Sequence, residues 1–183
     1  MDRLSVLLAA MVAAMAVALT VVLVGDGTPA GRIDGTEDLE WTLRLRDAEA
    51  ALAAGEAQVT IVRLRAAHRA ALRTGRWDAL IEVGDAARRA AEASTSPPRA
   101  IPTASRAYLA ALARAREQQS LDGVLRVGEG FAGLGDREMV EYCIGVAGRL
   151  AERDGGGERL ERVQVFVERH RATRTTASEG LRE

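Results

Sequence analysis

Glycines divide most of this chain into segments with helical periodicity. After residue 36, apolar residues recur three and four positions apart, and the segments end at Gly55, Gly75 and Gly155–Gly157. Aromatic residues make up only 3% of the composition, so the apolar residues are mostly Ala, Leu and Val, which favour helices over strands. The clearest buried face belongs to residues 137–153, through Met139, Val140, Cys143, Ile144, Ala147, Leu150 and Ala151. The sequence therefore predicts an all-α fold.

The expected helices are separated by glycines and by one proline-rich break. The break covers residues 94–103 and contains three prolines, which forbid a continuous helix. Thr36 and Asp136 have the position and chemistry of N-caps. Residues 163–167, VQVFV, alternate as a strand would, but no partner strand is evident, and we interpret them as helical. The expected helices span 38–54, 57–73, 77–93, 104–118, 121–132, 137–153 and 158–171.

Residues Leu4–Val24 form an uncharged run of 21 residues. At about 1.5 Å per residue, a helix of this length spans a hydrocarbon core of about 30 Å. The run predicts a single transmembrane signal-anchor, and Arg3 favours export of the remaining chain because positive charge stays in the cytoplasm. A cleaved signal peptide is the alternative, with candidate sites after Ala18 and Ala30. Both interpretations place the rest of the chain outside the cytoplasm.

Four regions follow from these features. We expect a membrane anchor in residues 1–25 and a glycine-rich linker in residues 26–36. A helical-repeat domain is expected over residues 37–172, followed by a polar, disordered tail over residues 173–183.

Charge along the chain is nearly balanced. The sequence has 25 basic residues, all of them arginine, against 26 acidic residues. Arginine and acid alternate along the sequence and form no basic run, which argues against nucleic acid as a partner. The single cysteine, Cys143, cannot form a disulfide within the chain.

Residues 127–136, VGEGFAGLGD, contain the glycine spacing of a dinucleotide-binding loop. That motif needs a strand before the glycines and a helix that begins among them, so that the helix N-terminus meets the pyrophosphate. Here the glycines continue to Gly135, and the capped helix begins after them. We therefore interpret Gly128, Gly130 and Gly133 as helix-packing positions and predict no nucleotide cofactor.

Residues 121–155 resemble a tetratricopeptide repeat, a helix-turn-helix unit of about 34 residues. Its packing positions are filled by Val124, Val127, Gly128, Phe131, Val140, Ile144 and Ala147, with Gly135 at the turn. A poorer copy spans the helices expected at 57–73 and 77–93, through Leu64, Ala67, His68, Ala71, Gly75, Leu80, Gly84 and Ala87. The resemblance implies an array of antiparallel helical hairpins that binds a partner protein or a second copy of the chain.

No constellation of catalytic residues is recognisable. His68 and His170 lack metal-ligand spacing, and Cys143 lies in an apolar stripe, so we predict no metal site and no enzymatic activity. Trp77 either packs in the core beside the turn at Gly75 or forms, with Arg88, the candidate partner surface. Trp41 either packs on the domain or rests at the lipid interface. The sequence predicts a membrane-tethered interaction module or assembly scaffold; the alternative is an exported enzyme or small-molecule binder.

Overall fold

The computed structural model describes residues 35–93, 100–153 and 156–179. Every regular element in these residues is an α-helix, which confirms the predicted all-α class. The predicted anchor and most of the predicted linker lie outside these residues. Among the helices that the structure describes, none is long and apolar enough to cross a membrane.

The helices agree closely with the expected segments. VQVFV lies within a helix, as predicted. One helix begins at Ile101, three residues before the expected start, because Pro102 lies in its first turn, where a missing N–H costs nothing. The last helix continues past residue 172 to Glu179, since no glycine or proline interrupts the sequence before Gly180. The bounds are α2 (Gly35–Ala53), α3 (Ala57–Thr74), α4 (Trp77–Ala93), α5 (Ile101–Glu117), α6 (Leu121–Gly133), α7 (Arg137–Arg153) and α8 (Gly157–Glu179).

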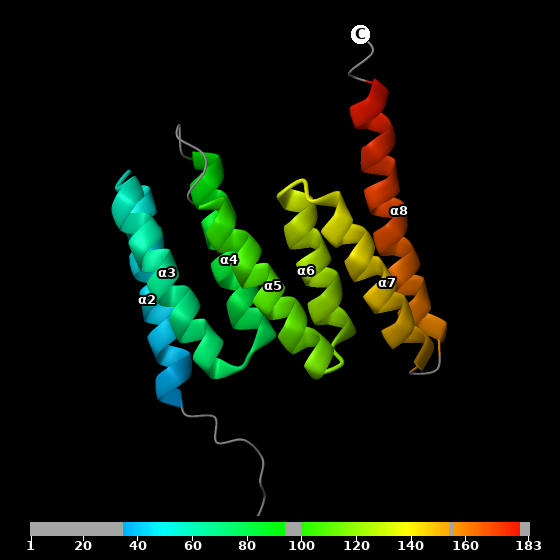
Figure 1. The fold of residues 1–183 in the computed structure, drawn as a ribbon, viewed down its shortest axis with the longest axis horizontal. Helices are drawn as coiled ribbons and strands as arrows, with labels where there is room; N and C mark the ends of the chain where they lie inside the picture. Colours follow the sequence, from blue (N-terminus) through cyan, green and yellow to red (C-terminus); the bar gives the residue numbers. More distant parts are fainter. Residues whose placement is uncertain (1–34, 94–99, 154–155, 180–183) are drawn as a thin grey trace, which may run out of the picture. The chain divides into compact units, whose positions relative to one another are not determined.

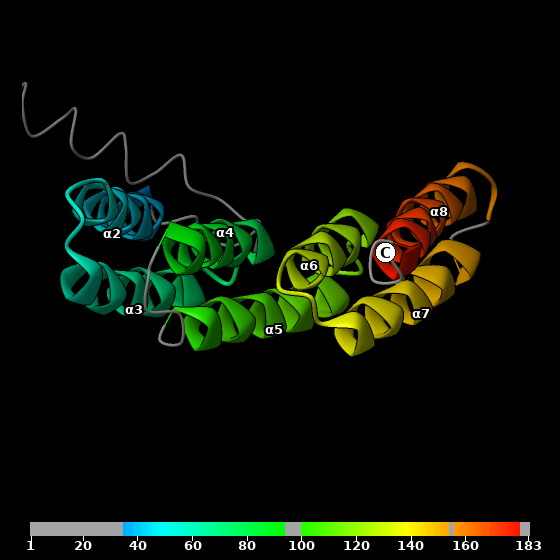
Figure 2. The same ribbon diagram turned by 90° about the horizontal axis from the view of Figure 1, so that it is seen from above.

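The helices of the compact unit Asp34–Glu183 form two layers (Figures 1 and 2). Helices α2, α4, α6 and α8 form one row, which we call the even layer. Helices α3, α5 and α7 form the other, the odd layer. The most extensive contacts join α2 to α3, α4 to α5 and α6 to α7, so each pair has one helix in each layer. Residues 121–155 therefore coincide with one pair, whereas the poorer copy joins α3 and α4, which belong to different pairs.

Short turns join α2 to α3, α3 to α4, α5 to α6 and α6 to α7, and their chemistry follows the sequence. Gly75 and Gly135 adopt φ values of 68° and 74°, a left-handed conformation that glycine reaches without a steric penalty. The Asp136 carboxylate accepts a hydrogen bond from the Met139 backbone N–H at 3.1 Å, which confirms it as an N-cap. The predicted N-cap Thr36 instead lies inside α2, which begins at Gly35.

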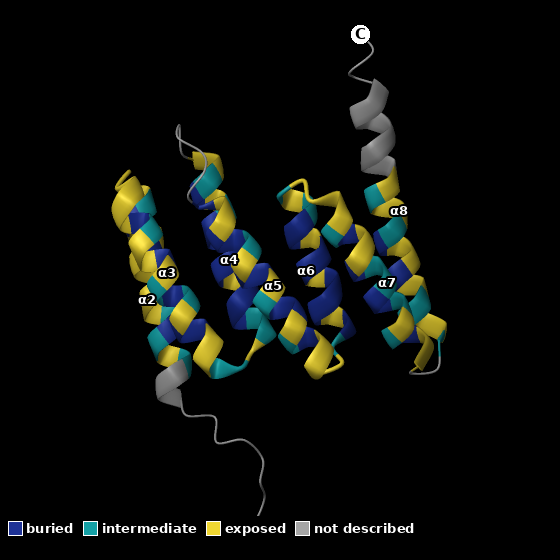
Figure 3. Cartoon of the chain, in the orientation of Figure 1, coloured by how far each residue is buried: buried dark blue, intermediate teal, exposed yellow. Residues whose placement is uncertain are grey.

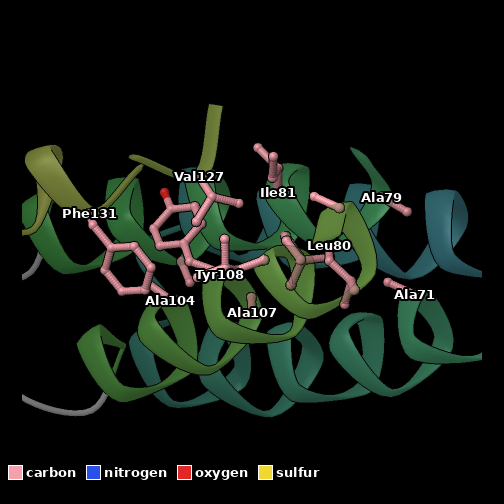
Figure 4. Packing of buried hydrophobic residues seen from close by; sticks show 14 of the residues in the cluster. Ala71, Ala79, Leu80, Ile81, Ala104, Ala107, Tyr108, Val127 and Phe131 are labelled. Carbon is pink, nitrogen blue, oxygen red and sulfur yellow. The ribbon is translucent and has the colours of Figure 1, made fainter. Parts of the chain in front are cut away.

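Buried residues are most extensive along α4, α5 and α6 (Figure 3). Among the fully buried side chains of the core, Tyr108 of α5 is one of the largest (Figure 4). Its fully buried ring lies between two helical glycines of the even layer. A Cβ atom added to Gly84 would lie 2.5 Å from a ring carbon, and one added to Gly130 would lie 2.6 Å from one. The Tyr108 hydroxyl donates a hydrogen bond of 2.7 Å to Asp85, so the ring's one polar group is satisfied. Glycine at both positions is therefore what allows α4 and α6 to approach α5.

The first three helices of the even layer share a sequence pattern. It consists of a large apolar residue, an aliphatic residue, a small residue and then an acid. The three instances are Trp41-x3-Leu45-x2-Ala48-Glu49, Trp77-x3-Ile81-x2-Gly84-Asp85 and Leu121-x3-Leu125-x2-Gly128-Glu129. Trp41 is only 6% exposed, so the first of them packs in the core, as one of the two interpretations of this residue predicted.

Candidate interaction surface

The acids of this pattern form a ladder of ion pairs along the even layer. Each acid reaches an arginine on the next helix of the same layer, and each pair bridges residues 40 or 41 positions apart. The pairs are Glu49–Arg89 at 2.8 Å, Asp85–Arg126 at 3.7 Å and Glu129–Arg169 at 3.2 Å. A fourth pair, Asp122–Arg162, also joins α6 to α8. Exposed pairs contribute little energy individually, but their repetition shows that successive helices of the even layer face one another through equivalent positions.

A hollow of about 670 Å³ opens between α4, α6 and α8 of the even layer. Its apolar part is formed by Trp77, Leu125, Val165 and Phe166. Charged residues of both signs surround this part: Asp122, Arg126, Glu129, Glu158, Glu161, Arg162 and Arg169. Val165 remains 49% exposed within the hollow. An apolar floor within a charged rim is the arrangement found at protein interfaces.

Trp77 is held in this hollow by a close helix approach. Its indole ring contacts α6 at Gly123, where an added Cβ atom would lie 2.9 Å from a ring carbon. The ring is half-buried and packs against the core on one side. Trp77 therefore lines the hollow, and its role at a partner surface stays a prediction.

Arg88, the other predicted surface residue, does not line the hollow. Its guanidinium pairs with Glu92 at 2.6 Å, and its side chain covers Gly133 of α6. The two predicted residues thus lie apart, because they stand eleven positions from one another on the same helix. The residues that share the hollow with Trp77 come from α6 and α8, and sequence reasoning missed them.

The predicted repeat-packing residues are mostly in the core. Gly135 is at an exposed turn, and Ile144 is half-buried. The remaining six are buried: Val124, Val127, Gly128, Phe131, Val140 and Ala147. Gly128 lies against α8, where an added Cβ atom would lie 2.7 Å from the Phe166 ring.

The glycines that resemble a nucleotide loop all lie inside one helix. Gly128, Gly130 and Gly133 belong to α6, and each receives a side chain from a neighbouring helix: Phe166, Tyr108 and Arg88, respectively. Helix α6 begins before these glycines, with Ser120 accepting a hydrogen bond from the Gly123 N–H at 3.0 Å. This confirms the interpretation of the glycines as packing positions.

The remaining side chains that could take part in catalysis or metal binding are each constrained by their surroundings. Burial raises the pKa of the Cys143 thiol to about 12, so the thiol stays protonated at neutral pH. Burial, together with the charges of Arg106 and Arg69, lowers the pKa of His68, whose Nε2 atom is buried without a hydrogen-bond partner. Among the described residues, no three His, Cys, Asp or Glu side chains are grouped to hold a metal ion.

Charge is distributed unevenly among helices α2 to α6, whereas α7 and α8 each carry arginines and acids in similar numbers. Helices α3 and α5 of the odd layer carry seven arginines and one glutamate. Helices α2, α4 and α6 of the even layer carry eleven acids and five arginines. The absence of a basic run in the sequence therefore does not reveal the arginines that α3 and α5 bring together, and the absence of a nucleic-acid partner stays a prediction. Alternation along the chain becomes segregation in space because successive helices belong to opposite layers.

No family model matches this sequence, and searches of the curated proteins and of the solved structures find no match either. What can be said of function therefore comes from the chain itself.

Proposed function

We propose that this chain is a membrane-tethered protein-interaction module, a scaffold or assembly factor with tetratricopeptide-like helical repeats. The hollow between α4, α6 and α8 is its binding site, and it accepts a segment of a partner protein. The apolar run Leu4–Val24 is the tether, and the helical unit lies outside the cytoplasm.

The observation that carries this proposal is the half-exposed apolar floor of the hollow. Trp77 and Val165 lie beside the buried Phe166 and Leu125, and the surrounding rim carries charges of both signs. A partner segment with one apolar anchor and flanking charges complements such a site. Large apolar and aromatic side chains at the centre of an interface carry most of its binding energy.

The test is co-purification of the tagged full chain from mildly solubilised membranes of its own host. Val165→Glu places a carboxylate on the floor of the hollow and should weaken partner binding by about 2 kcal/mol or more. Leu43→Glu on α2 is the matched control, because Leu43 has the same 49% exposure as Val165 and lies outside the hollow.

We expect the wild type and Leu43→Glu to retain a stoichiometric partner or second copy that Val165→Glu loses. Purification of all three as lone chains would contradict the proposal. Retention of the partner by Val165→Glu would remove the hollow as its binding site.

A second candidate function, small-molecule binding, is favoured by a separate pocket of about 430 Å³ between α6, α7 and α8. Val140, Ile144 and Val167 give it an apolar lining, and His170 and Arg137 add polar groups. This size and chemistry suit a small ligand. Ile144→Phe would fill the pocket. Recovery of a bound small molecule with the wild type but not with this variant would favour the second function.

A further inference from the structure

The exposed side of α3 and α5 combines positive charge with apolar side chains. On α3 the exposed side carries Val62, Arg65, Arg69, Leu72 and Arg73. On α5 it carries Arg106, Leu109, Ala113 and Arg116. These residues lie opposite the buried faces of the two helices, and the two helices are neighbours in the odd layer (Figure 2). We call this surface the basic face.

Several arginines of the basic face have no acidic partner within the described residues. Arg73 pairs with Glu40 of α2 at 2.8 Å, and Arg116 donates a hydrogen bond to the Tyr142 hydroxyl at 2.9 Å. Arg65, Arg69 and Arg106 form no ion pair among these residues, although acids are plentiful on the even layer.

The arrangement of these arginines opposes the folded state. Arg65, Arg69 and Arg73 follow one another at intervals of four residues, so their charges stand one above the other along α3. Like charges at this spacing destabilise a helix by a few tenths of a kcal/mol per pair. Arg106 adds a further positive charge from α5, close enough to act on His68 between them. An anionic surface outside the chain would relieve this repulsion.

The apolar residues indicate which kind of anionic surface. Val62 is 63% exposed and Leu109 is 48% exposed, and both stand among the arginines. A surface that inserts aliphatic side chains between headgroups while its arginines meet phosphates is typical of proteins that lie on anionic bilayers. Surfaces that bind single-stranded nucleic acid instead stack bases on aromatic side chains. Helices α3 and α5 expose none on this face, and the neighbouring Tyr142 of α7 is engaged by Arg116.

We propose that the basic face lies on the surface of a bilayer rich in anionic phospholipid. Arg65, Arg69 and Arg106 contact lipid phosphates, and Val62, Leu72 and Leu109 enter the headgroup region. This contact would leave the hollow, on the opposite layer, accessible to a partner. The inference extends the membrane part of the proposed function, but it depends on the tether only for delivery to the bilayer.

The test measures how close each layer lies to lipid headgroups. The full chain carries a fluorophore on a single introduced thiol, at Ala113→Cys in the odd layer or at Ala50→Cys in the even layer; both alanines are exposed. The native Cys143 is buried and is not labelled under native conditions. The chain is reconstituted into vesicles of phosphatidylcholine alone or of equal parts phosphatidylcholine and phosphatidylglycerol. A nitroxide on the lipid headgroups quenches fluorophores that lie at the surface.

We expect strong quenching at position 113 only in the anionic vesicles and little at position 50 in either. The triple variant Arg65→Gln, Arg69→Gln, Arg106→Gln should reduce quenching at position 113 to the level of position 50. The control triple variant Arg44→Gln, Arg46→Gln, Arg89→Gln removes the same charge from the even layer and should leave the quenching unchanged.

Equal quenching at positions 113 and 50 would overturn the proposal. So would quenching at position 113 that is the same with and without the anionic lipid, or the same in the wild type and in the first triple variant. So would an unquenched label together with tight, Arg65-dependent binding of an oligonucleotide, which would make the face a nucleic-acid surface. Alkaline extraction of the neutral vesicles tests the tether separately. If alkaline buffer extracts the chain from neutral vesicles while the chain still binds anionic vesicles, the proposed tether fails and the proposed role of the basic face stands.

Discussion

The two layers of this molecule differ in how their charged side chains are paired. In the even layer, each acid that follows the small residue of the repeated pattern pairs with an arginine of the next helix, as Glu49 does with Arg89 at 2.8 Å. In the odd layer, Arg65 and Arg69 repeat at a helical spacing and have no acidic partner among the residues that the structure describes. The comparison indicates that the acids of the repeated pattern are paired within the chain, whereas Arg65, Arg69 and Arg106 of the odd layer remain available to an anionic partner.

The exposed apolar residues of the two layers also differ in their surroundings. Exposed apolar residues of the even layer include Val165, which lies within a bounded hollow beside Trp77. Those of α3 and α5 lie scattered among arginines on an open face. A bounded hollow suits a defined partner segment, while an open face suits a surface without fixed shape, such as a bilayer.

The largest effect should come from the contact that joins the layers. Gly130→Ala places a methyl group against the buried Tyr108 ring, with the added carbon 2.6 Å from it, and should lower the free energy of unfolding by about 1–3 kcal/mol. Gly148→Ala is the matched control, because nothing lies within 4 Å of the added carbon. The control should raise the free energy of unfolding by about 0.5–1 kcal/mol, since alanine favours the helix. Urea unfolding measures both, and effects of the same sign would show that the layers do not meet at Tyr108.

A smaller effect is expected from His68 of the odd layer. Its pKa is lowered, so the folded state resists protonation, and stability should fall as the pH drops through the ordinary histidine value of 6.5. His68→Leu removes the unpartnered Nε2 atom and should raise the free energy of unfolding by about 1 kcal/mol. In this variant, the midpoint of thermal unfolding should depend much less on pH between about pH 7.5 and 5.5 than it does in the wild type. The control His170→Gln keeps His68 and should keep the dependence; its loss in the control instead would assign the effect to His170.

The smallest effect compares one arginine from each layer. Arg89→Gln breaks the Glu49 pair of the even layer and should lower the free energy of unfolding by about 0.2–1 kcal/mol. Arg69→Gln relieves repulsion in the odd layer and should raise it by about 0.2–0.5 kcal/mol. Both changes should shrink as salt is added, because salt screens exposed charges. If both variants change the free energy of unfolding in the same direction in dilute buffer, the distinction between paired arginines in the even layer and unpaired arginines in the odd layer is wrong.

Helix positions were predictable from the sequence because their determinants are local. Glycines such as Gly75 end helices through their own backbone conformation, and Asp136 caps α7 through a hydrogen bond three residues away. The apolar spacing of residues 137–153 identifies its buried face without knowledge of its neighbours. Only the helix ends differ from the prediction. Helix α5, for example, begins at Ile101, although the prolines of residues 94–103 were expected to delay its start.

The candidate surface was only partly predictable because it depends on which helices become neighbours. Trp77 was singled out as one of two tryptophans, but Val165 and Phe166 enter the same hollow from a helix about ninety residues later. The ion pairs join residues 40 positions apart and become visible only when alternate helices share a layer. One sequence signal was available: a small residue followed by an acid recurs at Ala48-Glu49, Gly84-Asp85 and Gly128-Glu129.

The most direct test of the division between layers is photo-crosslinking of the full chain in its native membranes. A photoreactive amino acid replaces Val165 in the hollow or Leu109 on the basic face, two residues with 49% and 48% exposure. We predict one discrete protein adduct from position 165, and lipid adducts without a discrete protein from position 109. The same protein adduct from both positions, or a protein adduct from position 109 alone, would contradict the account.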